Sequence, residues 1–224
     1  MFLFTYSLYR LVDRLLKING KNMEEILYGM GLAGMAVFAV SGALAAMRRE
    51  LDLFGMTVVA MVTAVGGGTL RDIILDVPVF WVQDPTVLYI AIVMAVTTPL
   101  WGRYLESRIK VLIWADAFGL ALFAVTGTAK ALSFGAMPII AVTMGVMTAA
   151  AGGVIRDILC NEIPLVLKKE LYALPAIIGG TCLVVLQMME LDHRLSIIVS
   201  CLLTLTIRLV AIQYSLSLPP VEKR

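Results

Sequence analysis

The chain has 224 residues, of which 60% are hydrophobic and 15% are charged. An ordinary soluble domain is about 45–50% apolar and about 25% charged, so this composition excludes one and indicates an integral membrane protein. The formal net charge is only +2, which is too small to suggest a nucleic-acid partner.

The first 22 residues differ from everything that follows. Between Leu8 and Lys17, apolar side chains recur at helical spacing and charged side chains interrupt them. This pattern favours an amphipathic helix that lies in the membrane interface. The segment lacks the charged start and the small-residue cleavage site of a signal peptide. We therefore expect an N-terminal extension at residues 1–22, with Met23 as an alternative beginning of the protein.

Seven later stretches satisfy the requirement of a transmembrane helix for roughly 20 predominantly apolar residues. Their connections are short and polar, so residues 23–214 are expected to form a single membrane domain, followed by a C-terminal tail at 215–224. The seven spans are expected at about Glu25–Met47, Leu53–Leu75, Thr86–Leu105, Val111–Leu132, Pro138–Cys160, Leu171–Met189 and Leu195–Tyr214.

The distribution of lysine and arginine among the connections predicts the orientation. On one side of the membrane the connections would be rich in lysine and arginine, and on the other side they would hold only Arg194, with Lys130 close by. Because basic loops favour the cytoplasm, the basic side is expected to be cytoplasmic. This places the C-terminus inside and the N-terminus outside. The basic residues of the N-terminal extension disagree, but a segment that lies on the surface need not set the topology of later spans. The basic side holds Arg48, Arg49, Arg103, Arg108, Lys110, Lys168, Lys169, Lys223 and Arg224.

The chain contains an internal repeat. TAVGGGTLRDI, which begins at Thr63, returns 85 residues later as TAAAGGVIRDI, which begins at Thr148. At the same spacing, 14 of the 40 residues from 34 to 73 are identical to their counterparts. The repeats cover about 24–106 and 109–192, and the seventh span at 195–214 lies outside them. Each repeat has three spans, an odd number, so the second copy is expected to be inverted in the membrane. Such all-α inverted repeats are common in transport proteins, with the site at the repeat interface.

Glycines interrupt the second and fifth spans at matching positions. Glycine has weak helix preference, so the helices are expected to bend or open there. Carbonyls freed in this way must face protein or water, and they can replace part of the hydration shell of a cation. The alternative is close packing of helices through small residues. The candidate pore glycines are Gly66, Gly67, Gly68, Gly152 and Gly153.

Each glycine group is followed by an arginine and an aspartate, Arg71-Asp72 and Arg156-Asp157. Charges within a span usually face the bundle interior or a cavity, and these four are candidates for lining the pore. The alternative is that they lie near helix ends and reach the interface. Adjacent helical residues point about 100° apart, so the two need not pair with each other. A pair between Arg71 and Asp157 would suit a two-fold axis.

Two further charges break the repeat. Asp116 stands where the first repeat has Gly31, and Lys130 stands where it has Ala45. Both are candidate pore residues that would make the path polar and asymmetric. A lysine beside a cation path would repel the ion, so Lys130 could serve as a gate. Arg208, in the seventh span, could instead reach the interface.

Motifs for soluble chemistry are missing from the sequence. GGGTLRD fits neither a dinucleotide-binding loop nor a phosphate-binding loop. Cys160, Cys182 and Cys201 lie in apolar runs without metal-ligand or CxxC spacing, and His193 lies in a short polar connection. We therefore expect no enzyme activity, no metal site and no cofactor.

The repeated GGGxxRD element and the FAV[ST]G element before it, at 38–42 and 123–127, resemble bacterial homologues of the TRIC proteins, the trimeric intracellular cation channels. Some relatives are labelled glycine transporter domain proteins. The resemblance implies a homotrimer in the bacterial inner membrane, with one pore inside each protomer. It implies permeation by potassium and sodium through the second and fifth spans, kinked at their glycines. Ala151 stands where the first copy has Gly66, so the two kinks need not be equally flexible.

Three functions remain open from the sequence. The first is a passive channel for monovalent cations. The second is a carrier for glycine or another small zwitterion, in which Arg71 or Arg156 would hold the carboxylate. The third is a membrane scaffold with closely packed glycines and no transport.

Overall fold

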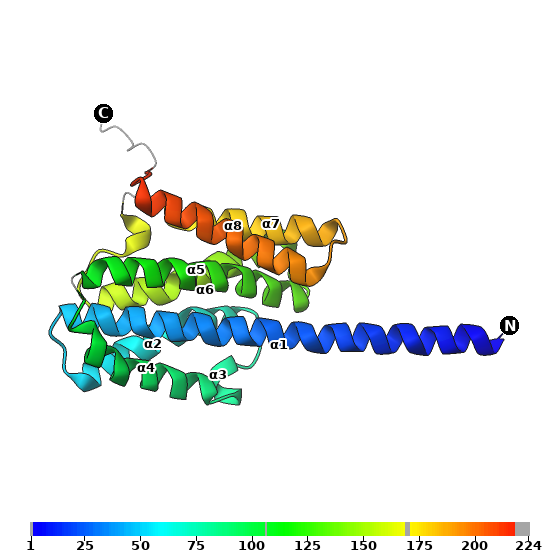
Figure 1. The fold of residues 1–224 in the computed structure, drawn as a ribbon, viewed down its shortest axis with the longest axis horizontal. Helices are drawn as coiled ribbons and strands as arrows, with labels where there is room; N and C mark the ends of the chain where they lie inside the picture. Colours follow the sequence, from blue (N-terminus) through cyan, green and yellow to red (C-terminus); the bar gives the residue numbers. More distant parts are fainter. Residues whose placement is uncertain (1, 106, 169–170, 218–224) are drawn as a thin grey trace.

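The computed structural model describes residues 2–105, 107–168 and 171–217, with the side chains from residue 25 onward in these ranges. Every element assigned within them is helical, which confirms the all-α class, and the longer helices lie side by side along one direction (Figure 1). The elements are α1 (Phe2–Arg48), α2 (Leu53–Ile74), α3 (Phe80–Gln83), α4 (Thr86–Gly102), α5 (Arg108–Ser133), α6 (Pro138–Leu159), the 3₁₀ helix η1 (Leu165–Leu167), α7 (Ala173–Met188) and α8 (His193–Gln213).

Local sequence signals fix several helix ends. The Asp52 carboxylate accepts a hydrogen bond from the Gly55 amide at 2.8 Å and caps α2, and Asp192 caps α8 in the same way. Past the C-terminal ends of α2 and α6, Asp76 and Asn161 have φ values of 53° and 50°. Asp and Asn tolerate this left-handed conformation better than most residues, which suits them to end a helix.

Five helices are long and apolar enough to cross a membrane: Glu25–Arg48 within α1, and α2, α5, α6 and α8. The helices α4 and α7 are apolar but have only 17 and 16 residues. At 1.5 Å per residue each is about 25 Å long, a little less than the bilayer core of about 30 Å. A short helix, α3 or η1, precedes each of them. All seven coincide in position with the predicted spans.

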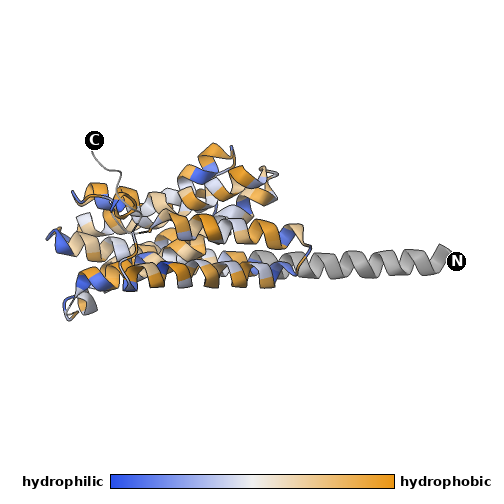
Figure 2. Cartoon of the chain, turned by 90° about the horizontal axis from the view of Figure 1, so that it is seen from above, coloured by the Kyte–Doolittle hydropathy of each residue, from blue (hydrophilic) through white to orange (hydrophobic). Residues whose placement is uncertain are grey.

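The lateral surface of the bundle is apolar, as a lipid-facing surface requires. Large hydrophobic side chains point outward from several helices, including Val93 on α4 at 53% exposure and Leu202 on α8 at 58%. Figure 2 shows hydrophobic residues along most of the helix lengths and many of the hydrophilic ones toward the ends of the bundle. Because lipid tails solvate such side chains, their exposure fits a membrane protein.

The predicted amphipathic extension at 1–22 lies outside the residues whose side chains the structure describes. Its backbone from Phe2 onward continues α1 without a break. The membrane-length part of that helix begins at Glu25.

The two halves of the chain pack against each other through matching helices. α1 packs on α5, and α2 packs on α6. Phe38 of α1 and Phe123 of α5, which are 85 positions apart, meet edge to face with ring centroids 5.1 Å apart. Each ring also lies where the Cβ of the other half's glycine would be, since Gly34 faces Phe123 and Gly119 faces Phe38. The contacts of the first half are therefore repeated by the second half.

Candidate functional site

The glycines of α2 and α6 meet at the crossing of these helices. A Cβ at Gly67 would collide with the carbonyl oxygen of Thr148, and a Cβ at Gly152 would collide with that of Thr63. Both helices run through their glycines without interruption. The helices are therefore not opened at their glycines in this structure, and a bend there stays a prediction. The glycines instead allow two continuous backbones to approach closely, the packing role that small residues take in membranes.

The other glycines of the two motifs face side chains. A Cβ at Gly66 would lie 3.0 Å from the Cδ1 atom of Ile155, which is the flexible end of a side chain. Gly68 faces the ring of Phe80, with 2.6 Å between the ring and the position of an added Cβ. Gly153 faces a polar group, because the Asp116 Oδ1 and the Tyr172 hydroxyl would each lie 3.1 Å from its Cβ.

Asp72 holds a cluster of charges at the end of α2. Its carboxylate accepts hydrogen bonds from the Arg71 Nε at 2.8 Å and from the Lys130 Nζ at 3.0 Å. It also accepts one from the Phe80 amide at 3.0 Å, which ties the start of α3 to α2. Asp72 is fully buried and Arg71 is 7% exposed, while the Lys130 side chain is 28% exposed. We call Arg71, Asp72 and Lys130 the Asp72 cluster, and its formal charge is +1.

Arg156 holds a second cluster at the end of α6. Its Nε donates to Asp157 and its Nη1 donates to Asp116, both at 2.8 Å, and Nη1 also donates to the Ser41 hydroxyl. Asp157 accepts from the Leu165 amide at 2.8 Å, as Asp72 accepts from the Phe80 amide. We call Arg156, Asp157 and Asp116 the Arg156 cluster, and its formal charge is −1.

Two of the alternatives that the sequence left open for these charges do not hold. Arg71 does not pair with Asp157, because each arginine folds back onto the aspartate that follows it. The four residues also do not reach the interface, since Arg156 is 0% exposed and Asp157 is 6% exposed. Helical directions left the pairing within one helix open, and it forms because an arginine side chain is long enough to turn toward a neighbour about 100° away. Buried charges of this kind need such a partner.

The Arg156 cluster includes residues that the sequence reasoning missed. Ser41 lies in the first FAV[ST]G element and reaches across to the second repeat. The fully buried Asp116 Oδ2 and Arg156 Nη2 atoms have no hydrogen-bond partner among the described residues. The Tyr172 hydroxyl faces the same glycine as Asp116 does, from the segment just before α7. Its signal in the sequence was only a tyrosine at the start of an apolar run.

A cavity of about 580 Å³ lies beside the Asp72 cluster. We call it the wide cavity. Arg71 and Lys130 line it, and it extends to Ala64 and Gly68, next to the α2–α6 crossing. Gly31 also lines it, at the position where the second repeat carries the buried Asp116. The absence of a side chain at Gly31 is one reason for the space here.

The rim of the wide cavity carries a negative charge. Tyr28 of α1 donates a hydrogen bond at 2.7 Å to Asp84, which lies between α3 and α4. Hydrogen bonds from Thr86 and from Tyr28 lower the pKa of Asp84 below its ordinary value. The carboxylate is therefore ionised at neutral pH, in a cavity that Arg71 and Lys130 also line.

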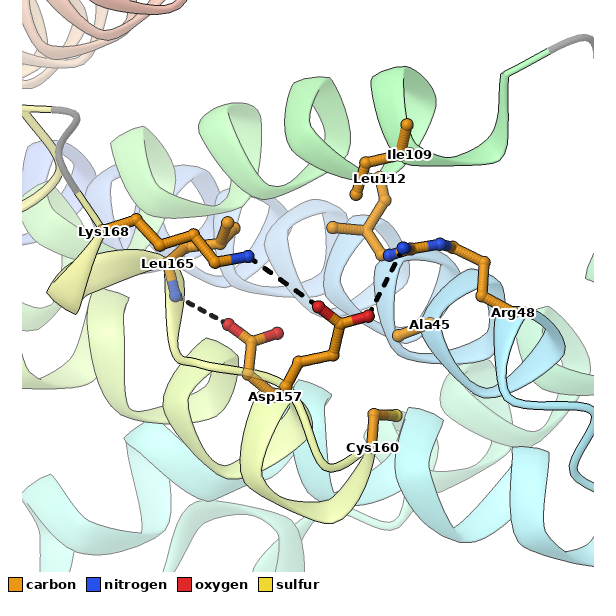
Figure 3. Close-up of a pocket in the computed structure, with 9 residues that line it drawn as sticks. Ala45, Arg48, Ile109, Leu112, Asp157, Cys160, Leu165 and Lys168 are labelled. Carbon is orange, nitrogen blue, oxygen red and sulfur yellow. Dashed lines mark hydrogen bonds and ion pairs between the residues drawn. The ribbon is translucent and has the colours of Figure 1, made fainter.

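A much smaller cavity, of about 10 Å³, lies beside Asp157 of the Arg156 cluster. We call it the narrow cavity. Figure 3 shows Arg48 and Lys168 approaching from opposite sides, above Asp157 and Cys160. Both basic side chains pair with Glu162, the first at 3.3 Å and the second at 3.8 Å. The two clusters thus differ in the space beside them, about 580 Å³ next to the Asp72 cluster and about 10 Å³ next to Asp157.

The remaining candidates do not form a site. All three cysteines are free. Within the part of the chain that the structure describes, no three His, Cys, Asp or Glu side chains are grouped so that they could hold a metal ion. Arg208 is buried rather than at the interface, with its Nη1 donating to the Leu171 carbonyl at 2.9 Å and its guanidinium 4.8 Å from the ring of Tyr172.

Comparison with protein families finds one matching model, described as a glycine transporter. It matches the chain twice, over residues 29–103 and 113–188. The two matches repeat each other at nearly the spacing of the sequence motifs.

Two curated relatives are described as membrane proteins of the family UPF0126. The UPF0126 inner membrane protein YadS of Escherichia coli strain K12 is 44% identical over 197 residues, which are 87% of this chain and 95% of YadS. The UPF0126 membrane protein YvgT of Bacillus subtilis strain 168 is 34% identical over 157 residues, 67% of this chain and 76% of YvgT.

Solved structures with the same fold are cation channels by description. The trimeric intracellular cation channel orthologue from Rhodobacter sphaeroides matches with a TM-score of 0.83 and 38% identity, over 85% of this chain and 99% of that one. A channel from a study of conductance through TRIC cation channels matches with a TM-score of 0.79 and 34% identity, over 87% and 97%. A prokaryotic TRIC channel in 0.5 M KCl has a TM-score of 0.81 and 30% identity, over 87% and 100%.

Proposed function

The chain belongs to the TRIC family, the trimeric intracellular cation channels, and from this membership we propose that it conducts potassium and sodium ions through a pore inside each protomer. The pore would run between α2 and α6, past the Asp72 and Arg156 clusters. The permeant ion is the only ligand in this proposal, and the protein performs no enzymatic reaction.

The observation that carries the proposal is the wide cavity. It has room for hydrated ions, and it ends at Gly68, beside the point where Gly67 touches Thr148. Beyond that point the backbones are in contact, so the path is closed in this structure. At the closest point the obstacles are the backbone carbonyls of Thr148 and Thr63, so a separation of α2 and α6 would be needed to admit an ion.

The finer architecture follows the same proposal. The seven helices α1, α2, α4, α5, α6, α7 and α8 each cross a bacterial inner membrane, as two inverted three-helix repeats and a seventh helix. The reciprocal contacts of Gly67 and Gly152 support a two-fold relation between the repeats. The narrow cavity, with Arg48 and Lys168, would face the cytoplasm, which places the C-terminus inside and the N-terminus outside. Three copies assemble into a homotrimer.

A carrier for glycine or another small zwitterion is the alternative, because the family model bears that description. The carboxylate of such a substrate would need a basic partner. Arg71 already gives its Nε and Nη2 to Asp72, at 2.8 Å each, and Arg156 is fully enclosed. This pairing favours the channel over the carrier.

The experiment that separates the two uses purified protein in liposomes. Potassium flux down a gradient is followed in one set of vesicles, and uptake of radiolabelled glycine is followed in a parallel set. Rapid, non-saturating potassium flux without glycine uptake is expected. Saturable glycine uptake with negligible potassium flux would overturn the proposal.

The charge of Lys130 gives a separate prediction. K130Q is expected to raise potassium conductance by about two- to fivefold at low ionic strength, because a unit charge a few ångströms away changes the energy of an ion in water by up to about 1 kcal/mol. The gain should shrink in molar salt, where the screening length falls to about 3 Å. Single-channel recording in planar bilayers measures both. K110Q, at the other end of α5, is the control and should leave conductance unchanged.

A further inference from the structure

The narrow cavity is the counterpart of the wide cavity in the other half of the protein. Six of the nine residues that line it lie 85 positions from a residue that lines the wide cavity. Among them, Leu165 corresponds to Phe80, and each follows an aspartate that accepts a hydrogen bond from its amide. The two cavities are therefore the same feature of the repeat, and their volumes are about 580 Å³ and 10 Å³.

Size alone does not order the two cavities. Leu165 is smaller than its counterpart Phe80, and Ala45 is smaller than its counterpart Lys130, so these two positions would leave more room in the narrow cavity. The replacements at the mouth are larger and also charged. Glu162 stands where the wide cavity has Val77.

At two further matched positions the narrow cavity has a basic side chain where the wide cavity has an uncharged one. Lys168 stands where the wide cavity has Gln83, and Arg48 stands where it has Ser133. At these three matched positions the wide cavity has uncharged residues, and the narrow cavity has an acid between two bases. In the structure Glu162 forms ion pairs with Arg48 and with Lys168 across the opening (Figure 3).

Glu162 is the centre of this arrangement. Its Oε1 pairs with Arg48 at 3.3 Å and with Arg49 at 3.0 Å, and its Oε2 pairs with Lys168 at 3.8 Å. Arg49 also donates to the Asn161 carbonyl at 3.1 Å, so the α1–α2 connection is held to the segment after α6. We call Glu162 with Arg48, Arg49 and Lys168 the Glu162 latch.

The latch is suited to opening. The side chains of Arg48, Arg49 and Lys168 are 33%, 42% and 40% exposed, and Glu162 is 23% exposed. Ion pairs that contact solvent are individually weak and are screened by salt. They also lie at the end of α1 and in the connections that follow α1 and α6, so releasing them disturbs little of the core.

We propose that the narrow cavity is a second vestibule for permeant cations, closed in this structure by the Glu162 latch. This inference rests on the proposed channel. When the latch separates, the vestibule opens toward Asp157 and the Arg156 cluster. The two ends of the α2–α6 crossing then differ in the charge nearest to it, since the Arg156 cluster carries −1 and the Asp72 cluster carries +1.

The cysteine that lines the narrow cavity provides the test. Cys160 is 3% exposed, and a thiol in an opened vestibule would react with a small neutral reagent such as iodoacetamide. The detergent-solubilised protein is labelled, and the rate at each cysteine is followed by peptide mass spectrometry. The labelling reaction needs no ion flux. The labelling experiment can therefore contradict the latch without contradicting the proposed channel, and the flux experiment in liposomes can contradict the channel without contradicting the latch.

E162Q is expected to raise the labelling rate of Cys160 at least fivefold at low salt, while Cys182 and Cys201 keep their rates. Raising the salt concentration should speed Cys160 labelling in the wild type but not in E162Q. E190Q, an exposed acid at the end of α7, is the matched control and should behave as wild type.

An unchanged Cys160 rate in E162Q would overturn the proposal. An equal rise at all three cysteines would overturn it as well, because it would indicate general loosening of the fold. The double variant R48Q/K168Q removes the partners instead of the acid and should reproduce the effect of E162Q. A slow Cys160 rate in that variant would also contradict the latch.

Discussion

Alanine at Gly67 is expected to lower the free energy of unfolding by at least about 3 kcal/mol and to abolish ion flux. Overpacking a filled interior typically costs about 1–3 kcal/mol, and here the obstacle is the carbonyl oxygen of Thr148 rather than a side chain that can rotate. The two helices must separate or shift along each other to admit even one methyl group. G152A should act alike, because its Cβ meets the Thr63 carbonyl. Thermal unfolding in detergent and potassium flux in liposomes measure the two effects.

The neighbouring glycine supplies the matched control for this prediction. G66A is expected to change stability by less than about 1 kcal/mol, since its Cβ meets only the tip of Ile155 and alanine favours the helix by about that amount. The second repeat already carries Ala151 at this position. Equal damage from G66A and G67A would mean that flexibility of the whole glycine run matters more than the α2–α6 contact.

The contrast between Gly66 and Gly67 also marks how far the sequence could lead. The apolar stretches predicted the positions of seven helices, and the spacing of the motifs predicted the repeat and pointed to the glycines. It could not predict which glycine faces a backbone, because that depends on how another helix crosses. The expectation that the helices would open came from glycine's intrinsic flexibility, and close packing of continuous helices overrode it.

The partners of the buried charges show a second limit. Helical geometry gives the direction of the Cα–Cβ bond. The guanidinium at the end of a long arginine side chain can still reach any of several nearby carboxylates. The sequence suggested that Asp116 and Lys130 break the symmetry of the repeats, but not that each joins a different cluster. The sequence gives no signal at Glu162, because an acid in a short connection is usually solvated. Its three basic partners in the structure indicate that it joins the ends of two helices instead.

The Arg156 cluster gives the other large expected effect. D116A is expected to lower the free energy of unfolding by about 3 kcal/mol, because removing one partner of a buried ion pair costs about 3–5 kcal/mol. Arg156 is 0% exposed and would keep only Asp157 and Ser41, which places the effect at the low end of that range. D116N keeps an oxygen that can accept the Nη1 hydrogen bond and should cost less.

The matching change in the other cluster should be milder, because the environment differs rather than the chemistry. K130A removes a partner of Asp72 that is 28% exposed, and Asp72 keeps Arg71 and the Phe80 amide, so the expected loss is no more than about 1 kcal/mol. Reversible unfolding of each variant in detergent gives the comparison. If D116A proved as mild as K130A, Asp157 alone would be enough to hold Arg156. The Arg156 cluster could then lose Asp116 without unfolding, and the role left for Asp116 would be to act on the permeating ion.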